Sequence, residues 1–309
     1  GSGKTVGYGN FIQIHIKQVY NNGTKDTVLL DTRDMMPRIQ VLDSLNTPLT
    51  YFKILSQMKK GDSLILRILT DSAFKKNPQE MPPFMKKGKY LFTHVSMVNI
   101  FETQAQADSA NKAERIAAKP RIYQNQLTEI EKDLATKKEQ LAIDDKIIQD
   151  YLLKNNIKAV KTKWGTYVAI TTEGTGEKLN SNNIASVNYT GRTLDSSKVF
   201  DSNTDPKFNH VEPLQVNLGD FSGIMVGWPD ALLQMKNGSK ATVYIPSSLA
   251  YGTSGKGGEI KPNDILIFDM AVTEASTEEA EIAKQQALQD KMIEEQKRIS
   301  DSTQKATKK

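Results

Sequence analysis

Residues Val187–Leu194 have the sequence VNYTGRTL, and residues Val199–Ser202, a few positions further on, have the sequence VFDS. Both lie in residues 164–274, a segment in which short strand-like runs alternate with turn residues. Such patterning is typical of strands joined by turns. The sequence therefore predicts a sheet-rich domain here, and the segments on either side of it differ from it in composition.

Further motifs follow these two strands in a fixed order. They are Leu218-Gly219, Gly227-Trp228, Gln234-Met235 with Gly238, Ile245-Pro246, Leu249–Gly252 and Ile265–Asp269. Each motif alone is weak, but the ordered set with its spacing resembles the FK506-binding proteins over residues 164–274. The resemblance implies an α+β fold in which an antiparallel sheet wraps around one short helix.

The resemblance also implies an activity, peptidyl-prolyl cis/trans isomerisation. Amide resonance holds the prolyl bond planar and gives a rotation barrier of roughly 18–20 kcal/mol. A dry aromatic cup lowers this barrier, because it excludes the water that stabilises the planar, more polar amide. No nucleophile, metal or cofactor is required, so we expect none. The expected partners are proline-containing polypeptides.

A role in such a cup follows from the resemblance for each of several residues. Trp228 would form the floor, the Tyr251 hydroxyl would donate to a substrate carbonyl, and Asp201 would act electrostatically on the twisting carbonyl. The backbone N–H of Met225 would bind a carbonyl of the extended peptide. Taken singly, the aromatic residues could be core residues and Asp201 a turn cap. The predicted set is Asp201, Tyr251, Phe200 and Trp228 for catalysis, and Tyr189, Ile224, Met225, Phe268 and Leu214 for substrate binding.

Three positions depart from the family pattern. Leu214 stands where an aromatic residue is common, Met225 replaces a branched residue, and Lys256 lies in the flap. These changes leave the substrate preference and the binding of macrolides such as FK506 open. The glycine-rich stretch Gly252–Gly258 could suggest phosphate binding, but no helix with exposed N–H groups is expected after it. We interpret it as a flexible lid.

An internal repeat extends the fold to the first part of the chain. Tyr51–Phe74 aligns with Trp228–Tyr251 without a gap, and both stretches contain Gln-Met-Lys followed two positions later by Gly. Leu30-Asp31-Thr32 also resembles Phe200–Ser202. Because helix, turn, strand and aromatic positions agree together, we predict two copies of one fold.

The first copy lacks much of the predicted site. Tyr51 stands in place of Trp228, Phe74 stands in place of Tyr251, and no tyrosine occurs near Ile16, where Tyr189 would fall. We therefore expect the first domain to be inactive or very weak as an isomerase. It would serve as a binding or spacing module.

The segment between the two copies is predicted to be helical. Residues 102–153 contain no glycine, and Pro120 is expected to split the segment and to open a new helix over 121–153. The apolar positions Leu127, Leu134, Leu141 and Ile148 recur every seven residues. So narrow a stripe suits a single partner helix, which leaves two alternatives, a spacer that contacts its own domains and an arm for homodimerisation.

Composition excludes several other kinds of function. The net charge is +5, with lysines scattered among acidic residues, so we expect no nucleic-acid groove. There is no cysteine, which excludes disulfides and thiolate metal sites. His15, His94 and His210 are far apart in the sequence and form no ligand pair, so no metal site is predicted.

The sequence thus predicts four segments: a degenerate domain over 1–101, a helical linker over 102–163, an isomerase domain over 164–274 and a charged helical tail over 275–309. Asp145–Asn156 and the following Trp164-Gly165 resemble the approach to the domain in bacterial envelope isomerases of the macrophage-infectivity-potentiator kind. With the opening Gly1–Thr5, which looks like a trimmed start left by a removed targeting segment or by a tag, this favours the periplasm and leaves an outer-membrane lipoprotein open. The main hypothesis is a folding catalyst. The rival is a non-catalytic chaperone or scaffold that uses the same pocket and the helical arms to hold client chains.

Overall fold

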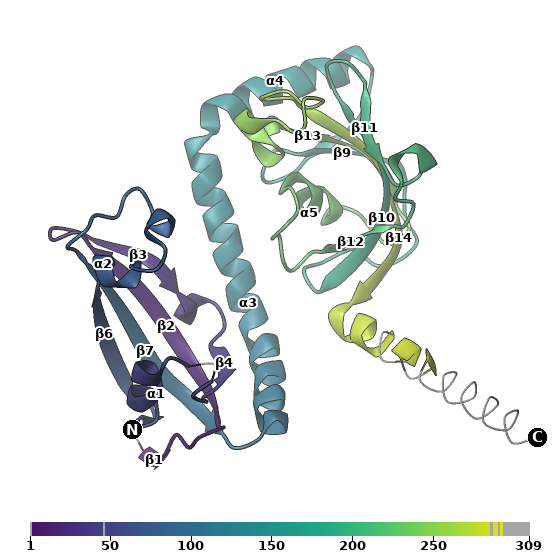
Figure 1. Ribbon diagram of the computed structural model, residues 1–309. Coiled ribbons are helices and arrows are strands. Elements are labelled where there is room, and N and C mark those ends of the chain that lie inside the picture. Colours follow the sequence, from purple (N-terminus) through teal and green to yellow (C-terminus); the bar gives the residue numbers. More distant parts are fainter. Residues whose placement is uncertain (1, 46, 285–286, 290, 293–309) are drawn as a thin grey trace, which may run out of the picture. The chain divides into compact units, whose positions relative to one another are not determined.

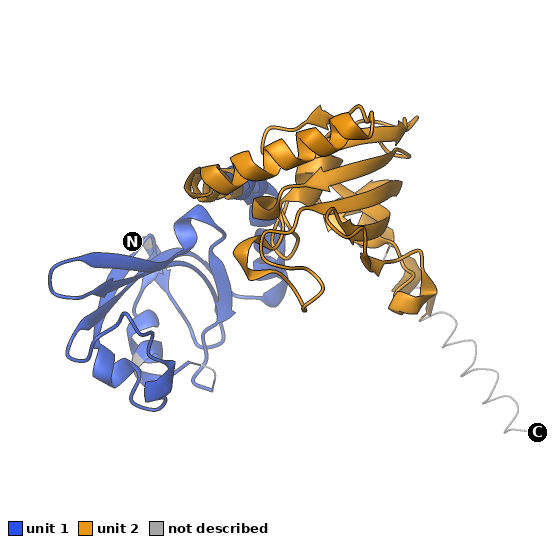
Figure 2. Ribbon diagram, turned by 90° about the horizontal axis from the view of Figure 1, so that it is seen from above, with its two compact units in different colours: residues 1–125 blue, residues 126–309 orange. Residues whose placement is uncertain are grey.

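The computed structural model describes residues 2–45, 47–284, 287–289 and 291–292, and the chain divides into two compact units, Gly1–Asn125 and Gln126–Lys309 (Figures 1 and 2). Each unit contains its own antiparallel sheet, and the boundary lies inside the long helix α3. The predicted α+β class is therefore confirmed. The division into four segments at residues 101, 163 and 274 stays a prediction.

The first unit has a five-stranded sheet in the order β3-β2-β7-β6, with β4 also paired to β2, and a separate two-stranded pair β1-β5. Ile12, Ile14 and Met97 point from the sheet to the short helix α1 and form the core with Leu55. The elements are β1 Ser2–Thr5, β2 Phe11–Asn21, β3 Asp26–Asp31, β4 Arg38–Val41, α1 Leu49–Leu55, β5 Lys59–Lys60, β6 Ser63–Leu69, α2 Thr70–Ala73 and β7 Tyr90–Phe101.

The second unit has the strand order β11-β10-β14-β13-β9-β8, with β12 also paired to β10. The short helix α5 packs against this sheet, and all six of its residues are buried. The elements are β8 Val160–Lys161, β9 Tyr167–Thr172, β10 Asn183–Thr193, β11 Val199–Ser202, β12 Leu214–Asn217, α5 Gly227–Leu232, β13 Lys240–Ile245 and β14 Leu266–Thr277. Single 3₁₀ turns occur at Pro206–Phe208, Ser247–Leu249 and Gly252–Ser254.

The two sheets share one connectivity. The order β3-β2-β7-β6 with β4 on β2 repeats as β11-β10-β14-β13 with β12 on β10. Both central pairs also carry an irregularity at the same place, between Gln13 and Ile14 on β2 and between Ser186 and Val187 on β10. Because a bulge fixes the register of a strand, Ile14 corresponds to Val187, and two residues later Ile16 corresponds to Tyr189.

This register corrects one detail of the sequence alignment. Asp201 pairs with Gly191, which lies two residues after Tyr189. In the first unit, Gln18 lies two residues after Ile16 and pairs with Leu30. Leu30, and not Asp31, therefore stands at the position of Asp201. A strand slip of one residue reverses which face a side chain occupies, and sequence similarity over three residues was too short to fix the register.

The helices between the sheets differ from the prediction in two ways. Helix α3 runs over Gln104–Thr136 and passes through Pro120 without ending there. Proline removes one helical hydrogen bond, so other contacts are needed to keep the helix continuous past it. Here the Arg121 guanidinium donates to the Met35 carbonyl at 2.5 Å, and the Asn125 amide donates to the Asp34 carbonyl at 2.7 Å.

The predicted continuous helix over 121–153 is also wrong, because it is interrupted at Lys137. This residue has non-helical backbone angles, and α4 begins after it and spans Lys138–Lys154. The seven-residue stripe nevertheless has a clear partner in the second unit. Leu134 and Leu141 pack against its main core, and Ile148 is completely buried against Tyr244 and Ile267 on the face of the sheet that α4 covers (Figure 2). Over these positions the stripe faces its own domain.

The described part of the tail is helical at residues 278–284, 287–289 and 291–292. Its apolar side chains Ile282, Leu288 and Met292 are exposed. Ile293 and the expected fraying toward Lys308-Lys309 lie outside the described residues.

Candidate functional site

Trp228 lies at the centre of the second unit, in the first turn of α5, with 2% of its surface exposed. The glycine before it explains how the helix comes so close to the sheet. A Cβ atom on Gly227 would lie 2.3 Å from Cγ2 of Ile245 on β13, which is far inside van der Waals contact. The indole N–H of Trp228 is buried and has no hydrogen-bond partner among the described residues. The indole is therefore held by packing alone.

Three further rings surround Trp228. Tyr189 meets it edge to face at a centroid distance of 5.0 Å, and Phe268 does so at 5.2 Å. Phe200 contacts Phe268 in turn at 5.7 Å. Edge-to-face pairs at these distances add stability beyond the buried area, so the four rings form one rigid aromatic group. The sequence-predicted aromatic residues of this site are thus brought together by β10, β11, β14 and α5.

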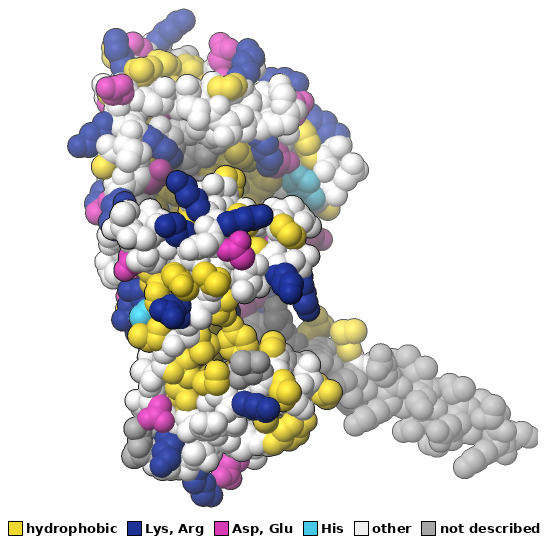
Figure 3. All heavy atoms as spheres, turned by 60° about the vertical axis from the view of Figure 1, so that its left-hand side comes forward, with side chains coloured by type: hydrophobic (Ala, Val, Ile, Leu, Met, Phe, Trp, Pro, Cys, Tyr) yellow, Lys and Arg dark blue, Asp and Glu magenta, His cyan; other side chains and the backbone are white. Residues whose placement is uncertain are grey.

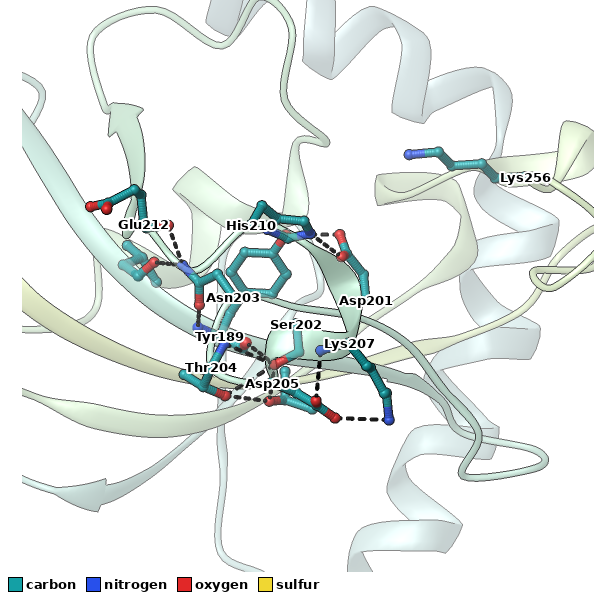
Figure 4. Close-up of polar contacts among 12 residues, drawn as sticks. Tyr189, Asp201, Ser202, Asn203, Thr204, Asp205, Lys207, His210, Glu212 and Lys256 are labelled. Atoms are coloured by element: carbon teal, nitrogen blue, oxygen red, sulfur yellow. Dashed lines mark hydrogen bonds and ion pairs between the residues drawn. The ribbon is translucent and has the colours of Figure 1, made fainter.

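A carboxylate lies at the edge of this aromatic group. The Tyr189 hydroxyl donates to Oδ2 of Asp201 at 2.8 Å, and Nε2 of His210 lies 2.7 Å from the other oxygen, Oδ1 (Figure 4). Both oxygens of Asp201 are therefore engaged, which fixes the plane of the carboxylate. His210 was not predicted as a site residue. It follows an irregular loop with a left-handed residue at Asn209, and no sequence spacing predicts where such a loop places a side chain.

Burial keeps Tyr189 in its neutral, hydrogen-bonding form. Its pKa is raised well above the ordinary value of 10.0, first because the phenol is removed from water and second because it donates to Asp201. The loop after β11 is held just as firmly. The Asn203 side chain accepts from the Tyr189 N–H at 2.7 Å and donates to the Val187 carbonyl at 3.0 Å. Asp201 therefore lies on β11 directly before a loop whose backbone is held on β10.

Tyr251 stands at the root of the flap and packs partly buried against the main core. The ammonium group of Lys256 donates to its hydroxyl at 3.2 Å and lies 5.0 Å from the centre of its ring. The flap itself closes as a small hairpin, since the N–H of Lys256 donates to the Ile260 carbonyl at 2.8 Å. Lys256, which departs from the family pattern in the sequence, thus contacts the Tyr251 hydroxyl that is expected to act as a donor.

The remaining predicted residues fall into two groups. Ile224 and Met225 lie in the loop before α5 and pack against the aromatic core. The backbone carbonyl of Met225 accepts from the backbone N–H of Trp228 at 3.0 Å. Leu214 is the first residue of β12, is 37% exposed, and is not among the side chains packed on the core. The structure therefore brings all the predicted residues but Leu214 into one packed group.

Two further observations on the described residues concern metals and membranes. Within residues 2–45, 47–284, 287–289 and 291–292, no group of three His, Cys, Asp or Glu side chains could hold a metal ion. Among the helices in the described part of the chain, none combines the length and apolarity that a membrane crossing needs. The chemical resources of the site are aromatic surface, one oriented carboxylate and hydroxyl donors.

Comparison with known proteins gives the class of protein to which this fold and site belong. Residues 175–273 match the family model of FKBP-type peptidyl-prolyl cis-trans isomerase. FK506-binding protein 2 of Kluyveromyces lactis is 37% identical over 101 residues, which are 33% of this chain and 69% of the yeast protein. At that identity and coverage, the chain belongs to the FKBP-type peptidyl-prolyl cis-trans isomerase family.

Bacterial relatives match a longer stretch of the chain. The probable FKBP-type peptidyl-prolyl cis-trans isomerase FkpA of Neisseria meningitidis is 31% identical over 166 residues, which cover 54% of this chain and 57% of that protein. The match thus spans little more than half the length of this relative. Among solved structures, the crystal structure of FkpA from Escherichia coli aligns with 57% of this chain and 74% of its own, at 25% identity and a TM-score of 0.36.

Proposed function

We propose that the second unit catalyses the cis/trans isomerisation of X-Pro bonds in polypeptide clients and so assists protein folding. The observation that carries the proposal is the oriented carboxylate at the rim of the aromatic group, with Asp201 held by Tyr189 and His210 beside Trp228. Family membership supports the same activity. An aromatic surface with one fixed charge suits a reaction in which no covalent bond is made.

Each part of the site has a role in this proposal. Trp228, Phe200, Phe268, Ile224 and Met225 hold the proline ring in a dry environment that disfavours the polar, planar amide. Asp201 acts on the carbonyl as it rotates out of conjugation, when its charge distribution changes most. The Tyr251 hydroxyl donates to a client carbonyl and keeps the peptide in place. Leu214, which is exposed, would contact only the client residues outside the proline pocket.

The test is turnover of a short X-Pro peptide by the intact chain and by Asp201→Val and Tyr251→Phe. We expect the intact chain to accelerate isomerisation and each substitution to lower kcat/KM by about tenfold, the equivalent of roughly 1.4 kcal/mol of transition-state binding. Lys207→Ala serves as the control, because this lysine lies in the loop after β11, close to Asp201 in the sequence, but pairs with Asp205. If the intact chain is no faster than buffer, the proposal is wrong.

We further propose that the first unit is a degenerate copy of the same fold. The shared connectivity and the shared bulge support this relation. At the corresponding positions it has Ile16 in place of Tyr189 and Leu30 in place of Asp201, so it lacks both the donor and the carboxylate. Adding Tyr251→Phe to the Asp201→Val chain should therefore lower turnover further, because the activity that remains after the first substitution comes from the second unit.

The alternative function, a chaperone or scaffold that holds client chains, is favoured by one observation on the first unit. Several of its large apolar side chains are exposed, among them Leu45 at 88%, and hydrophobic side chains gather over its surface in the lower half of Figure 3. Large exposed apolar patches commonly bind other chains. The chaperone function would be supported if the intact chain suppresses the light scattering of an aggregating client that contains no proline. This suppression should persist in Asp201→Val.

Location and assembly complete the proposal. We propose the periplasm, with anchoring as an outer-membrane lipoprotein, because of the resemblance to bacterial envelope isomerases, and cell fractionation tests it. We propose binding of FK506-like macrolides because of the family resemblance, and we keep a homodimer through the helical linker as the alternative use of its apolar stripe. Sedimentation and displacement of a labelled macrolide test these two. The helical segment 102–163 and the tail 275–309 would act as arms of the catalytic domain 164–274 and of the domain 1–101.

A further inference from the structure

A cleft of 710 Å³ lies beside the flap of the second unit. One wall is the junction between α3 and α4, and the other is the root of the flap with Asn263. Its lining includes Lys138, Gln140, Ile143, Tyr251, Thr253 and Ser254. Tyr251 belongs both to this cleft and to the side chains packed on the aromatic core. The cleft is therefore continuous with the rim of the proposed active site, and its volume is in the range of ordinary ligand sites.

The two walls of the cleft are tied together by one buried carboxylate. Asp144 on α4 is 1% exposed and accepts from both the N–H and the hydroxyl of Ser247, at 2.8 and 2.7 Å. Gln140, which lines the cleft, donates to the other oxygen of Asp144 at 2.8 Å. Hydrogen bonds to a buried charge are among the stronger ones in proteins, so the cleft is a built feature of the domain with fixed walls.

The walls combine apolar and charged groups. Ile143 is 54% exposed although it lies in the cleft, and an apolar side chain left open to water gains by being covered. Lys138 is exposed, and among the described residues it forms no ion pair. Glu139, which is also exposed, lies next to it in the lining. The cleft therefore offers an apolar contact, and the opposite charges of Lys138 and Glu139 favour neither sign of client charge.

We propose that this cleft binds the client segment that flanks the prolyl bond, with an apolar side chain of the client against Ile143. The inference rests on the proposed function and adds a preference for extended clients with an apolar residue close to the proline. An extended chain advances about 3.3 Å per residue, so a client that passes Tyr251 enters the cleft within a few residues of its proline. Binding remote from the reacting bond lowers KM without changing the chemical step.

The experiment compares a tetrapeptide with peptides extended by about six residues, or roughly 20 Å, on the N-terminal or the C-terminal side. Each extension contains either leucine or serine, and exchange NMR measures turnover without a protease. For the intact chain we expect one leucine-containing extension to lower KM about fivefold with kcat unchanged. Ile143→Ser and Ile143→Asn should each remove this gain and leave the tetrapeptide unaffected.

Matched controls on the same helix separate the cleft from general effects of substitution. Ile147→Ser removes an apolar side chain that is 43% exposed on α4 but does not line the cleft, and Lys146→Glu reverses a charge that pairs with Asp150. Both should keep the gain. If neither extension lowers KM, or if the cleft variants behave like the controls, the inference is wrong. If the tetrapeptide itself is not turned over, the proposed function fails, and fluorescence anisotropy of the labelled extended peptide with the same variants still decides the cleft.

Discussion

Gly191 on β10 lies directly below two rings of the aromatic group. A Cβ atom there would stand 2.6 Å from Cε1 of Phe268 and 2.8 Å from Cζ of Phe200. Glycine weakens a strand because it adds backbone entropy and packs nothing. Here that cost is offset, since the absent side chain leaves the space in which Phe200 and Phe268 meet edge to face.

Gly191→Ala should therefore separate these rings. We expect a loss of unfolding free energy of about 2 kcal/mol, because an added methyl group in a close-packed site forces its neighbours to shift. Urea unfolding measures this loss, and kcat/KM for a short X-Pro peptide should fall with it. Gly223→Ala is the control for glycine replacement as such, because nothing lies within 4 Å of a Cβ at that position, although its φ of +80° adds backbone strain. Equal turnover by Gly191→Ala and the intact chain would contradict this account of the site.

His210 offers a second test at the same scale. Its contact with Oδ1 leaves Asp201 with two fixed partners, so His210→Ala should free the carboxylate to rotate about Tyr189. We expect kcat to fall about threefold, with little change in stability, since an exposed hydrogen bond contributes roughly 1 kcal/mol or less. His210→Gln should restore part of the loss through its amide donor. No difference between His210→Ala and Lys207→Ala would show that His210 does not position Asp201.

Single residues also show how far the sequence predicts the site. Trp228, Phe200, Phe268 and Tyr189 were expected together, and the structure brings them together because each occupies a regular strand or helix position. His210 escaped prediction because it lies on a loop whose path depends on the left-handed residue Asn209. The roles of these residues in catalysis stay predictions.

At the scale of elements, helix α4 is part of the second unit and not only a linker. It buries Ile148 and Leu152 against the sheet face formed by β9, β13 and β14. The sequence predicted helix here, yet it did not predict the break at Lys137. Helical propensity favours continuation at such a lysine, and only the packing of Leu134 and Ile148 on two different surfaces requires a change of direction.

Asp144→Ala tests the attachment of this helix. The substitution leaves the N–H and hydroxyl of Ser247 buried without their acceptor, so we expect a loss of about 3 kcal/mol in unfolding free energy. Asp150→Ala on the same helix is the matched control. Its carboxylate forms an exposed ion pair with Lys146, and such pairs contribute about 0.5 kcal/mol. Similar losses in the two variants would show that α4 is held by its apolar contacts alone.

At the scale of the whole chain, one strand connectivity occurs in both units, with different side chains in each. The alignment of Tyr51–Phe74 with Trp228–Tyr251 predicted this repetition because it preserved the order of helix, turn and strand, and the two sheets share their connectivity. The register between β2 and β3 could not be predicted in the same way. It depends on a bulge, which inserts one residue without a characteristic sequence.

Ionisation of buried tyrosines should make the stability of the second unit depend on alkaline pH. Burial, as the largest cause, raises the pKa of Tyr189 and Tyr167, and it raises the pKa of Tyr244 to about 12. Because these folded pKa values lie above the ordinary value of 10.0, the stability they contribute is complete below pH 10.0 and is lost as the pH rises through the folded values. Each such tyrosine steepens the loss by up to about 1.4 kcal/mol per pH unit.

Urea unfolding of the intact chain at alkaline pH measures this dependence. Tyr244→Phe should reduce the slope of unfolding free energy against pH above pH 10.0 by up to about 1.4 kcal/mol per pH unit, the contribution of one proton. Tyr8→Phe in the first unit is the control for the loss of a phenol hydroxyl as such, because Tyr8 is exposed. A slope for Tyr244→Phe equal to that of the intact chain would contradict the assignment.

The hydrogen bonds between Asp144 and Ser247 also have a mechanical consequence. Ser247 lies four residues before Tyr251, so α4 is anchored beside the root of the flap. Strain introduced into this helix, for example by a bound partner, would therefore act on the backbone next to Tyr251, at the rim of the candidate site.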